Sequence, residues 1–307
     1  MSILSKPYFH DESAAYDHLE AVLWPTGPVC PHCGCTGRIS AIKPNPEKRV
    51  RFGLKKCGDC KKQFTVKVGT VFEASNVKLH LWLQAVHLMV SSKKGISSHQ
   101  LHRVLEVTYK TAWFMTHRIR EAMRNGSLAP MGSDGGIVEV DETYIGVKDE
   151  SRGKKPWGGM GHKMAVVTLV DRAGSARSFH VDRVTQASVM PIIRANLDRE
   201  ARIITDDSGV YRRVDREYLH AFVNHTAKEW GRGEIHTNTI EGFYSIFKRG
   251  MKGVYQHCGE KHLHRYLAEF DFRYSNRSAT GIEDAERSRI ALAGIVGKRL
   301  TYRRTGA

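Results

Sequence analysis

Three acidic side chains, Asp141, Asp206 and Glu241, lie where the local sequence favours the display of a carboxylate. Residues 137–145 alternate apolar and polar side chains, which predicts a half-buried strand with Asp141 on its polar face. Asp206 ends a second apolar run, and Glu241 opens a helical stretch. Mg²⁺ prefers oxygen ligands, and two such ions about 3.5–4 Å apart can clamp the attacking and leaving oxygens of a phosphodiester displacement. The three acids therefore predict a two-metal site, with solvated surface acids as the alternative.

Lys248 follows Glu241 at a spacing of two helical turns, so the ammonium and the carboxylate share one helix face. A cation beside a metal-facing acid suits a site that must hold polyanionic DNA, and we therefore include Lys248 among the catalytic candidates. An ordinary ion pair on a helix surface is the alternative.

Three segments of the chain resemble the catalytic blocks of the DDE transposases. They are Val-Asp-Glu-Thr-Tyr-Ile-Gly at 140–146, Ile-Thr-Asp at 204–206, and the stretch at 236–250 that contains Ile-Glu-Gly-Phe-Tyr-Ser-Ile-Phe-Lys-Arg. The resemblance covers about residues 15–280 and is to the bacterial insertion-sequence transposases related to the eukaryotic Merlin elements, which carry an N-terminal zinc ribbon. It implies a ribonuclease-H-like fold for the catalytic domain, with Asp141, Asp206 and Glu241 as ligands of two Mg²⁺ or Mn²⁺ ions.

The third ligand has a rival in the same block. Some members of this group are described with an Asn in place of the third acid, and Asn238 lies one turn before Glu241. We prefer Glu241 because an ionised carboxylate binds Mg²⁺ better than a neutral amide does. His225 and His236 flank the block and are candidates for contacts just outside the ligand set, although a lone His is more often structural.

The net charge indicates the class of partner. The chain has 48 Lys and Arg against 32 Asp and Glu among 307 residues, a formal charge of +16. Such an excess predicts a polyanionic partner, because neutralising the phosphates of DNA or RNA releases counterions, and the resemblance implies double-stranded DNA. A merely soluble basic protein is the alternative. Short basic clusters supply the predicted DNA contacts Lys154, Lys155 and Arg249, the first two in a Gly- and Lys-rich loop for which a plain exposed hairpin is the alternative.

The sequence argues against export and membrane insertion. No run of about 18 apolar residues occurs, and the N-terminus lacks the charged-then-apolar layout of a signal peptide. We therefore expect a cytoplasmic protein, and the resemblance implies a bacterial one that associates with the nucleoid.

Four of the six cysteines form two Cys-x-x-Cys pairs separated by a basic segment: Cys30, Cys33, Cys57 and Cys60. This spacing predicts one structural, tetrahedral Zn²⁺ ion in a zinc ribbon over residues 15–70. Disulfides are the alternative, which we disfavour because a cytosolic compartment keeps thiols reduced. Cys35 follows the first pair closely and is an alternative to Cys33, whereas Cys258 has no partner at a useful spacing.

Residues 71–127 predict a helical module. Apolar side chains recur at helical spacing in its first helix: Leu79, Trp82, Val86 and Met89. Two further helices, the second from about 108 to 123, resemble a helix-turn-helix and would present Lys110, Thr111, His117 and Arg118 to DNA. A three-helix cluster that binds no DNA is the alternative.

The rest of the chain alternates predicted strands with helices, after a linker at 126–136. We expect strands at 137–145, 164–170, 176–181, 201–205 and 221–223, and helices at 187–197, 239–249 and 260–275. This order predicts an α/β catalytic domain with a mixed sheet over 135–280, followed by a basic C-terminal tail at 281–307.

We expect a DNA transposase that cuts at the ends of an insertion sequence and joins the freed 3′-hydroxyls to target DNA, with no covalent protein intermediate. Synapsis of two ends makes a homo-oligomer on DNA the expected assembly. Two alternatives stay open: a ribonuclease-H-like nuclease without strand transfer, and a zinc-ribbon DNA-binding regulator. A covalent Ser or Tyr recombinase has the weakest case, because nothing around Tyr144 or Ser245 is arranged to activate a nucleophile.

Overall fold

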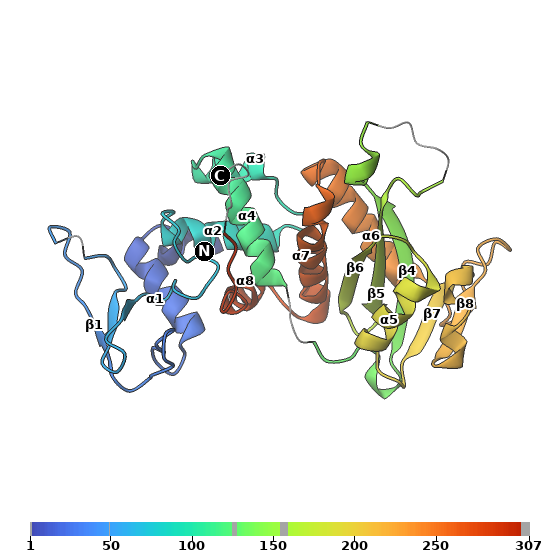
Figure 1. Cartoon of the computed structure of the whole chain (residues 1–307), viewed down its shortest axis with the longest axis horizontal. Helices are drawn as coiled ribbons and strands as arrows, with labels where there is room; N and C mark the ends of the chain where they lie inside the picture. Colours follow the sequence, from blue (N-terminus) through green and yellow to red (C-terminus); the bar gives the residue numbers. More distant parts are fainter. Residues whose placement is uncertain (1, 49, 125–127, 154–158, 302–307) are drawn as a thin grey trace. The chain divides into compact units, whose positions relative to one another are not determined.

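The chain divides into two compact units (Figure 1). The structure is a computed structural model that describes residues 2–48, 50–124, 128–153 and 159–301. Unit 1 contains residues 1–124 and 282–307, and unit 2 contains residues 125–281. The predicted acids therefore all belong to unit 2, and the two cysteine pairs belong to unit 1.

Unit 1 opens with helix α1 (Glu12–Leu23), where the sequence pattern predicted no helix. The side chain of Asp11 caps this helix, because its Oδ1 accepts a 2.8 Å hydrogen bond from the Ala14 amide. A small antiparallel sheet follows, in the order β1 (Ile39–Ala41), β2 (Lys55–Cys57) and β3 (Gln63–Phe64). Lys55 on β2 forms a 2.9 Å ion pair with Glu20 on α1, so the helix is attached to the sheet.

Helix α2 (Leu79–Ser91) lies at the centre of unit 1 and packs against α1, α4 (Tyr109–Met123) and α8 (Asp284–Ala293). Its four predicted apolar positions are all buried, which confirms the helical spacing as a core-facing stripe: Leu79, Trp82, Val86 and Met89. Helix α3 (Ser98–Leu105) packs against α4, and Glu106 makes the turn between them in a left-handed conformation with φ of 53°. Ser97 and Thr108 cap these two helices, as hydroxyls that accept hydrogen bonds from backbone amides.

The stretch predicted as a basic tail, 281–307, instead contains helix α8, which belongs to the core of unit 1. Arg287 on α8 donates a 3.2 Å hydrogen bond to the Val90 carbonyl near the end of α2, and His87 on α2 lies 3.0 Å from the Ser288 hydroxyl. The chain comes back to unit 1 only after the whole of unit 2, and such a distant contact leaves no pattern in the local sequence. The prediction of a tail therefore depended on the basic composition alone.

Unit 2 is built on a five-stranded sheet in the order β6-β5-β4-β7-β8. The strands are β4 (Ile137–Ile145), β5 (Met164–Asp171), β6 (Ala176–Val181), β7 (Arg202–Asp206) and β8 (Leu219–Val223). The first three pair antiparallel, whereas β7 and β8 run parallel to β4 and to each other. This mixed sheet confirms the predicted fold class, and the strands agree with the sequence prediction to within a few residues.

Helices cover both faces of this sheet (Figure 1). α5 (Gln186–Asn196) packs on the face that presents Val138 and Val140, and α6 (Asn238–Gly250) and α7 (Leu263–Ser275) pack on the opposite face. Every residue of β5 is buried, as expected of an inner strand covered on both sides. None of the helices formed by the described residues has the length and apolar composition that a bilayer span requires.

Short 3₁₀ and π turns complete the two units: η1 (Ile3–Ser5), η2 (Pro7–Phe9), η3 (Ser133–Gly135), η4 (Asp149–Ser151), η5 (Gly209–Tyr211), η6 (Val214–Arg216), η7 (Met251–Tyr255), η8 (Glu260–His262) and η9 (Ser278–Thr280).

Candidate functional sites

Asp141 and Asp206 lie on neighbouring parallel strands of unit 2. Strands β4 and β7 pair Glu139 with Ile204, and two residues further along each strand come Asp141 and Asp206. Equivalent positions on paired parallel strands project from the same face of a sheet. The structure therefore brings the first two predicted ligands side by side, at the carboxyl end of β7.

Burial and neighbouring acids disfavour the ionisation of both carboxyl groups. Burial raises the pKa of Asp141 to about 8, and the charge of Glu142 adds to the rise. A 2.7 Å hydrogen bond from the Glu142 amide opposes the rise, and the charge of Asp206 raises the pKa of Asp141 again. Burial also raises the pKa of Asp206. Crowded carboxylates of this kind gain from a bound cation, and their oxygens fit Mg²⁺ or Mn²⁺.

Glu142 is a further acid of this site, and the strand pattern did not select it. Its Oε2 accepts a 2.6 Å hydrogen bond from the hydroxyl of Tyr211, a buried residue on η5. Burial raises the pKa of Glu142, the bond from Tyr211 lowers it, and the charge of Asp206 raises it. The sequence did contain a signal: Glu142 falls on the apolar face of the alternating strand. An acid on that face is costly to bury without a partner.

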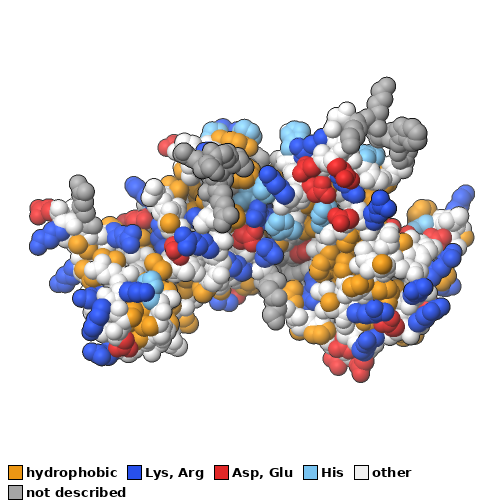
Figure 2. All heavy atoms as spheres, viewed as in Figure 1, with side chains coloured by type: hydrophobic (Ala, Val, Ile, Leu, Met, Phe, Trp, Pro, Cys, Tyr) orange, Lys and Arg blue, Asp and Glu red, His pale blue; other side chains and the backbone are white. Residues whose placement is uncertain are grey.

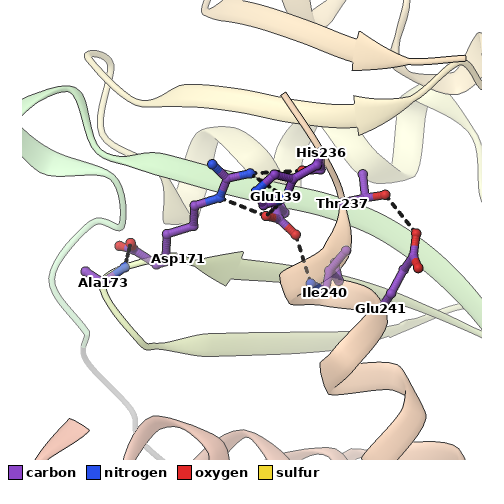
Figure 3. A network of polar contacts seen from close by, with 8 residues as sticks. Glu139, Asp171, Ala173, His236, Thr237, Ile240 and Glu241 are labelled. Carbon is purple, nitrogen blue, oxygen red and sulfur yellow. Dashed lines mark hydrogen bonds and ion pairs between the residues drawn. The ribbon is translucent and has the colours of Figure 1, made fainter. Parts of the chain in front are cut away.

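Glu241 lies on the exposed side of the first turn of α6 and is bonded to the residue that precedes the helix. Its Oε1 accepts a 3.0 Å hydrogen bond from the hydroxyl of Thr237 (Figure 3). Among the described residues, only the four paired cysteines form a group of three or more Cys, His, Asp or Glu side chains close enough to share an ion. The expected convergence of all three acids is therefore not seen. Asn238, the alternative third ligand, is the first residue of α6 and is exposed.

Lys248 and Tyr244, further along α6, both act on Asp141. The charge of Lys248 lowers the pKa of Asp141, and its Nζ lies 5.7 Å from the centre of the Tyr244 ring. The Tyr244 hydroxyl donates a 2.7 Å hydrogen bond to the Asp141 carbonyl. Helix α6 is thus attached to β4 at the residue that carries the first predicted ligand, and the cation of Lys248 acts there.

The two histidines beside the third block occupy different environments. The charge of His225 lowers the pKa of Asp206, which places this histidine near the carboxylates. His236 instead belongs to a buried network on Glu139, in which its Nδ1 lies 2.9 Å from an Arg172 guanidinium nitrogen (Figure 3).

The four predicted cysteines of unit 1 converge, and their sulfurs all lie within 4.8 Å of one another. Cys30 and Cys60 are 3.7 Å apart, and Cys33 and Cys57 are 3.6 Å apart. A tetrahedron with Zn–S bonds of about 2.3 Å has sulfurs about 3.8 Å apart, so the cluster fits Zn²⁺. All four cysteines are free thiols, which argues against the disulfide alternative.

The thiols of the cluster differ in pKa. A backbone hydrogen bond with Cys35 lowers the pKa of Cys33, but burial and hydrogen bonds with the other three thiols outweigh it and raise this pKa to about 12. Backbone hydrogen bonding from Cys60 is the main cause that lowers the pKa of the Cys57 thiol to about 6, against the effect of burial. A thiolate is the form that binds metal. Cys35, the alternative to Cys33, lies outside the cluster, and a hydrogen bond with Asp59 raises its pKa.

Helix α4 presents only part of the predicted DNA contact. Lys110 is exposed and Thr111 partly exposed, both in its first turn. His117 and Arg118 are both buried. The Arg118 guanidinium donates hydrogen bonds to the carbonyls of Leu300 (3.1 Å) and Glu73 (3.0 Å). The prediction that Arg118 is presented to DNA is therefore wrong, because this side chain holds the chain's return to unit 1.

The remaining basic candidates are on unit 2. Arg249 is exposed at the end of α6 and bonds to Ser245, one turn earlier. Lys154 and Lys155 lie outside the described residues. Figure 2 shows Lys and Arg side chains spread over the visible face of each unit.

Comparisons with known proteins bear on both units. Residues 134–275 match the ISXO2-like transposase domain, and residues 10–63 match a transposase zinc-ribbon domain. Each unit is thus similar to a domain of known transposases. A Halobacterium salinarum protein, described as an uncharacterized protein in transposable element ISH50, is 28% identical over an alignment of 280 residues that covers 86% of this chain and 91% of the relative.

A solved structure also shares a likeness, but a weak one. It is a simian T-cell lymphotropic virus intasome in complex with PP2A regulatory subunit B56 gamma, and it matches with a TM-score of 0.28 and 14% identity. The match covers 56% of this chain and 63% of that chain. At this TM-score the likeness carries no argument. The relation to Merlin elements stays a prediction.

Proposed function

We propose that this protein is a transposase that cuts at the ends of an insertion sequence and joins the freed 3′-hydroxyls to target DNA, with Mg²⁺ or Mn²⁺ held by unit 2. The observation that carries the proposal is the placement of Asp141 and Asp206 two residues beyond the last registered pair of neighbouring parallel strands, inside the matched transposase domain. The raised pKa of each carboxyl supports it, because the crowding is relieved by a cation.

Asp141 and Asp206 would hold the metal, with Glu241 as the third ligand and Asn238 as its rival. When bound, the ions would neutralise charge on the phosphodiester and on its leaving oxygen. Glu241 would reach the ions by exchanging its bond to Thr237, a side-chain rearrangement at an exposed helix turn.

The chain's own residues contribute positioning and charge. Water first attacks the phosphodiester at the element end, and the broken bond leaves a 3′-hydroxyl on one strand end. That hydroxyl then attacks a target phosphodiester in line, and the target's own 3′-oxygen leaves. Lys248 would hold a DNA phosphate beside Asp141, and Tyr244 would fix the backbone that carries this ligand.

Unit 1 would supply recognition of element ends. We propose that one Zn²⁺ ion holds the ribbon together and that the exposed first turn of α4, with Lys110 and Thr111, contacts double-stranded DNA. The domain limits 15–70, 71–127 and 135–280 and a homo-oligomer that pairs two DNA ends on the nucleoid belong to the same proposal.

The test uses the full chain, duplexes that carry the ends of its own element, and Mg²⁺. We expect cleaved 3′ ends and products joined to a target plasmid, both resolved on sequencing gels. Glu241→Gln should remove both products by about a hundredfold or more, and Asn238→Ala should change them little, because only the carboxylate is an anionic ligand. Inactivation by Asn238→Ala alone would reverse the assignment of the third ligand.

The rival functions predict different products. Cleavage without joining would identify a ribonuclease-H-like nuclease. Specific binding of the ends with no cleavage in Mg²⁺ or Mn²⁺ would identify a DNA-binding regulator.

A further inference from the structure

Glu139 is a fully buried acid, two residues before Asp141 on β4, and its two oxygens have different partners (Figure 3). One oxygen, Oε1, accepts a 2.8 Å hydrogen bond from Arg172 Nε and lies 3.5 Å from His236 Nδ1. The other, Oε2, accepts a 2.9 Å hydrogen bond from the Ile240 amide. A carboxylate with both oxygens occupied in this way is placed to hold protein groups together.

The bond to Ile240 caps α6 from a distance. Thr237 is the residue before this helix and makes no capping hydrogen bond with its side chain. Glu139, 101 residues earlier in the chain, satisfies a first-turn amide in its place. An anion at a helix N-terminus is favourable, because free amides and the helix dipole both point at it.

Arg172 fixes the segment that leads into α6. It follows β5 directly, and one of its terminal nitrogens donates a 3.0 Å hydrogen bond to the His236 carbonyl. The same guanidinium holds Glu139, so the ion pair joins β4 to the chain that enters the helix. The side chain of Arg172 is only 21% exposed, which limits solvent screening of this contact.

Two bonds thus set α6 against β4. Glu139 holds the helix at Ile240, next to Glu241, and Tyr244 holds it at the carbonyl of Asp141. Because Glu139 and Asp141 are two residues apart on one strand, their side chains leave the same face of the sheet. The start of α6 therefore has a fixed place relative to the paired aspartates.

We propose that Glu139 is a positioning residue: together with Arg172, it sets where α6 begins and so where Glu241 can meet Asp141 and Asp206. This proposal rests on the proposed function, because it assumes that Glu241, in the third block, is a ligand of the metal site. Glu139 is not itself offered as a ligand, since its oxygens are buried and already bonded to Arg172 and Ile240.

The test compares Glu139→Gln with Glu269→Gln in the full chain. Glu269 is the matched control: it is also fully buried and also pairs with an arginine, Arg273, but it lies on α7 away from these contacts. The two variants are compared by thermal melting, by Mn²⁺ binding in calorimetry, and by the Mg²⁺ concentration that gives half-maximal cleavage. We expect both to lower the melting temperature.

Only Glu139→Gln should weaken Mn²⁺ binding and raise the required Mg²⁺, each by about tenfold, the usual effect of losing a partner that orients metal ligands. Equal Mn²⁺ affinity and Mg²⁺ requirement in the two variants would overturn the proposal. If Glu139→Gln does not fold, Arg172→Lys replaces it: this variant keeps the charge and loses the bond to the His236 carbonyl, and we expect a smaller shift in the same direction.

Mn²⁺ binding separates this proposal from the proposed function, because it needs no turnover. Wild-type protein that binds Mn²⁺ but neither cuts nor joins DNA would refute the proposed function, while a weaker affinity in Glu139→Gln would still support positioning. Wild-type protein that binds no Mn²⁺ would overturn both.

Discussion

The cysteine cluster of unit 1 and the carboxylates of unit 2 are two candidate metal sites. They differ in how many of their predicted ligands the structure brings together. The four sulfurs already have the spacing of a tetrahedral Zn²⁺ shell, with two pairs 3.6 and 3.7 Å apart. Of the three acids, only Asp141 and Asp206 come together, and Glu241 bonds to Thr237. A site whose ligands are complete suits a structural role, whereas an incomplete one leaves room for substrate.

The difference also lies in the source of each site. Each cysteine pair comes from one tight turn, so a short sequence spacing decides most of its geometry. The carboxylates come from two strands and a later helix, and they meet through sheet register and the anchoring of α6. The cysteine site should therefore matter most for folding, and the carboxylate site for chemistry.

The largest expected effect is the loss of zinc. Cys57→Ser should unfold the ribbon, because Zn²⁺ binding in such modules supplies about 10 kcal/mol or more of folding free energy. Metal analysis should give one zinc per wild-type chain and none in the variant, and circular dichroism should show the loss of structure. Cys258→Ser is the control and should keep its zinc, since this thiol lies in unit 2. A wild-type protein with a folded ribbon and no zinc would contradict the structural role of the cysteine site.

The next effect separates chemistry from stability. Asp141→Asn should reduce cleavage and joining by about a thousandfold or more, because the site loses an anionic ligand. DNA binding should stay near the wild-type level. Joining in Mg²⁺ that survives this change would contradict the carboxylate assignment.

The same variant should stabilise the metal-free protein at alkaline pH. The folded pKa of Asp141 is raised to about 8, so the folded state holds a proton that the unfolded state releases near pH 4. Stability therefore falls as pH rises from about 4 to 8, and Asn removes this loss. The difference between these two pKa values corresponds to at most about 5 kcal/mol, so we expect a gain of several degrees in melting temperature at pH 8.5 and no gain at pH 4. If the difference in melting temperature between variant and wild type is the same at pH 4 and pH 8.5, the pKa of Asp141 is not raised in the folded protein.

Sequence pattern predicted the unit 2 strands because each carries its own alternation of side chains, and β4 has the expected limits Ile137–Ile145. It also predicted the cysteine site, whose spacing is local. It missed α1, whose apolar stripe is weak, and α8, which returns to unit 1 after the whole of unit 2. It misjudged Arg118, because a basic side chain that bonds distant carbonyls has the same sequence signal as one that faces DNA. Glu139 escaped notice for a related reason, since its partners Arg172 and Ile240 are far away in the chain.

The smallest effect concerns DNA recognition by unit 1, for which Lys110 and Arg118 form a matched pair on one helix. Lys110 is exposed in the first turn of α4, so Lys110→Ala should weaken binding of element-end DNA a few-fold at physiological salt. If the ammonium contacts a phosphate, the slope of log affinity against log salt should also fall by about 1, equally for all sequences. Arg118 is buried, so Arg118→Ala should lower the melting temperature of unit 1 and leave the salt slope of the folded protein unchanged. Titrations by fluorescence anisotropy at several salt concentrations measure both. A reduced slope in Arg118→Ala with normal stability would return that residue to the DNA surface and contradict its assignment to the core of unit 1.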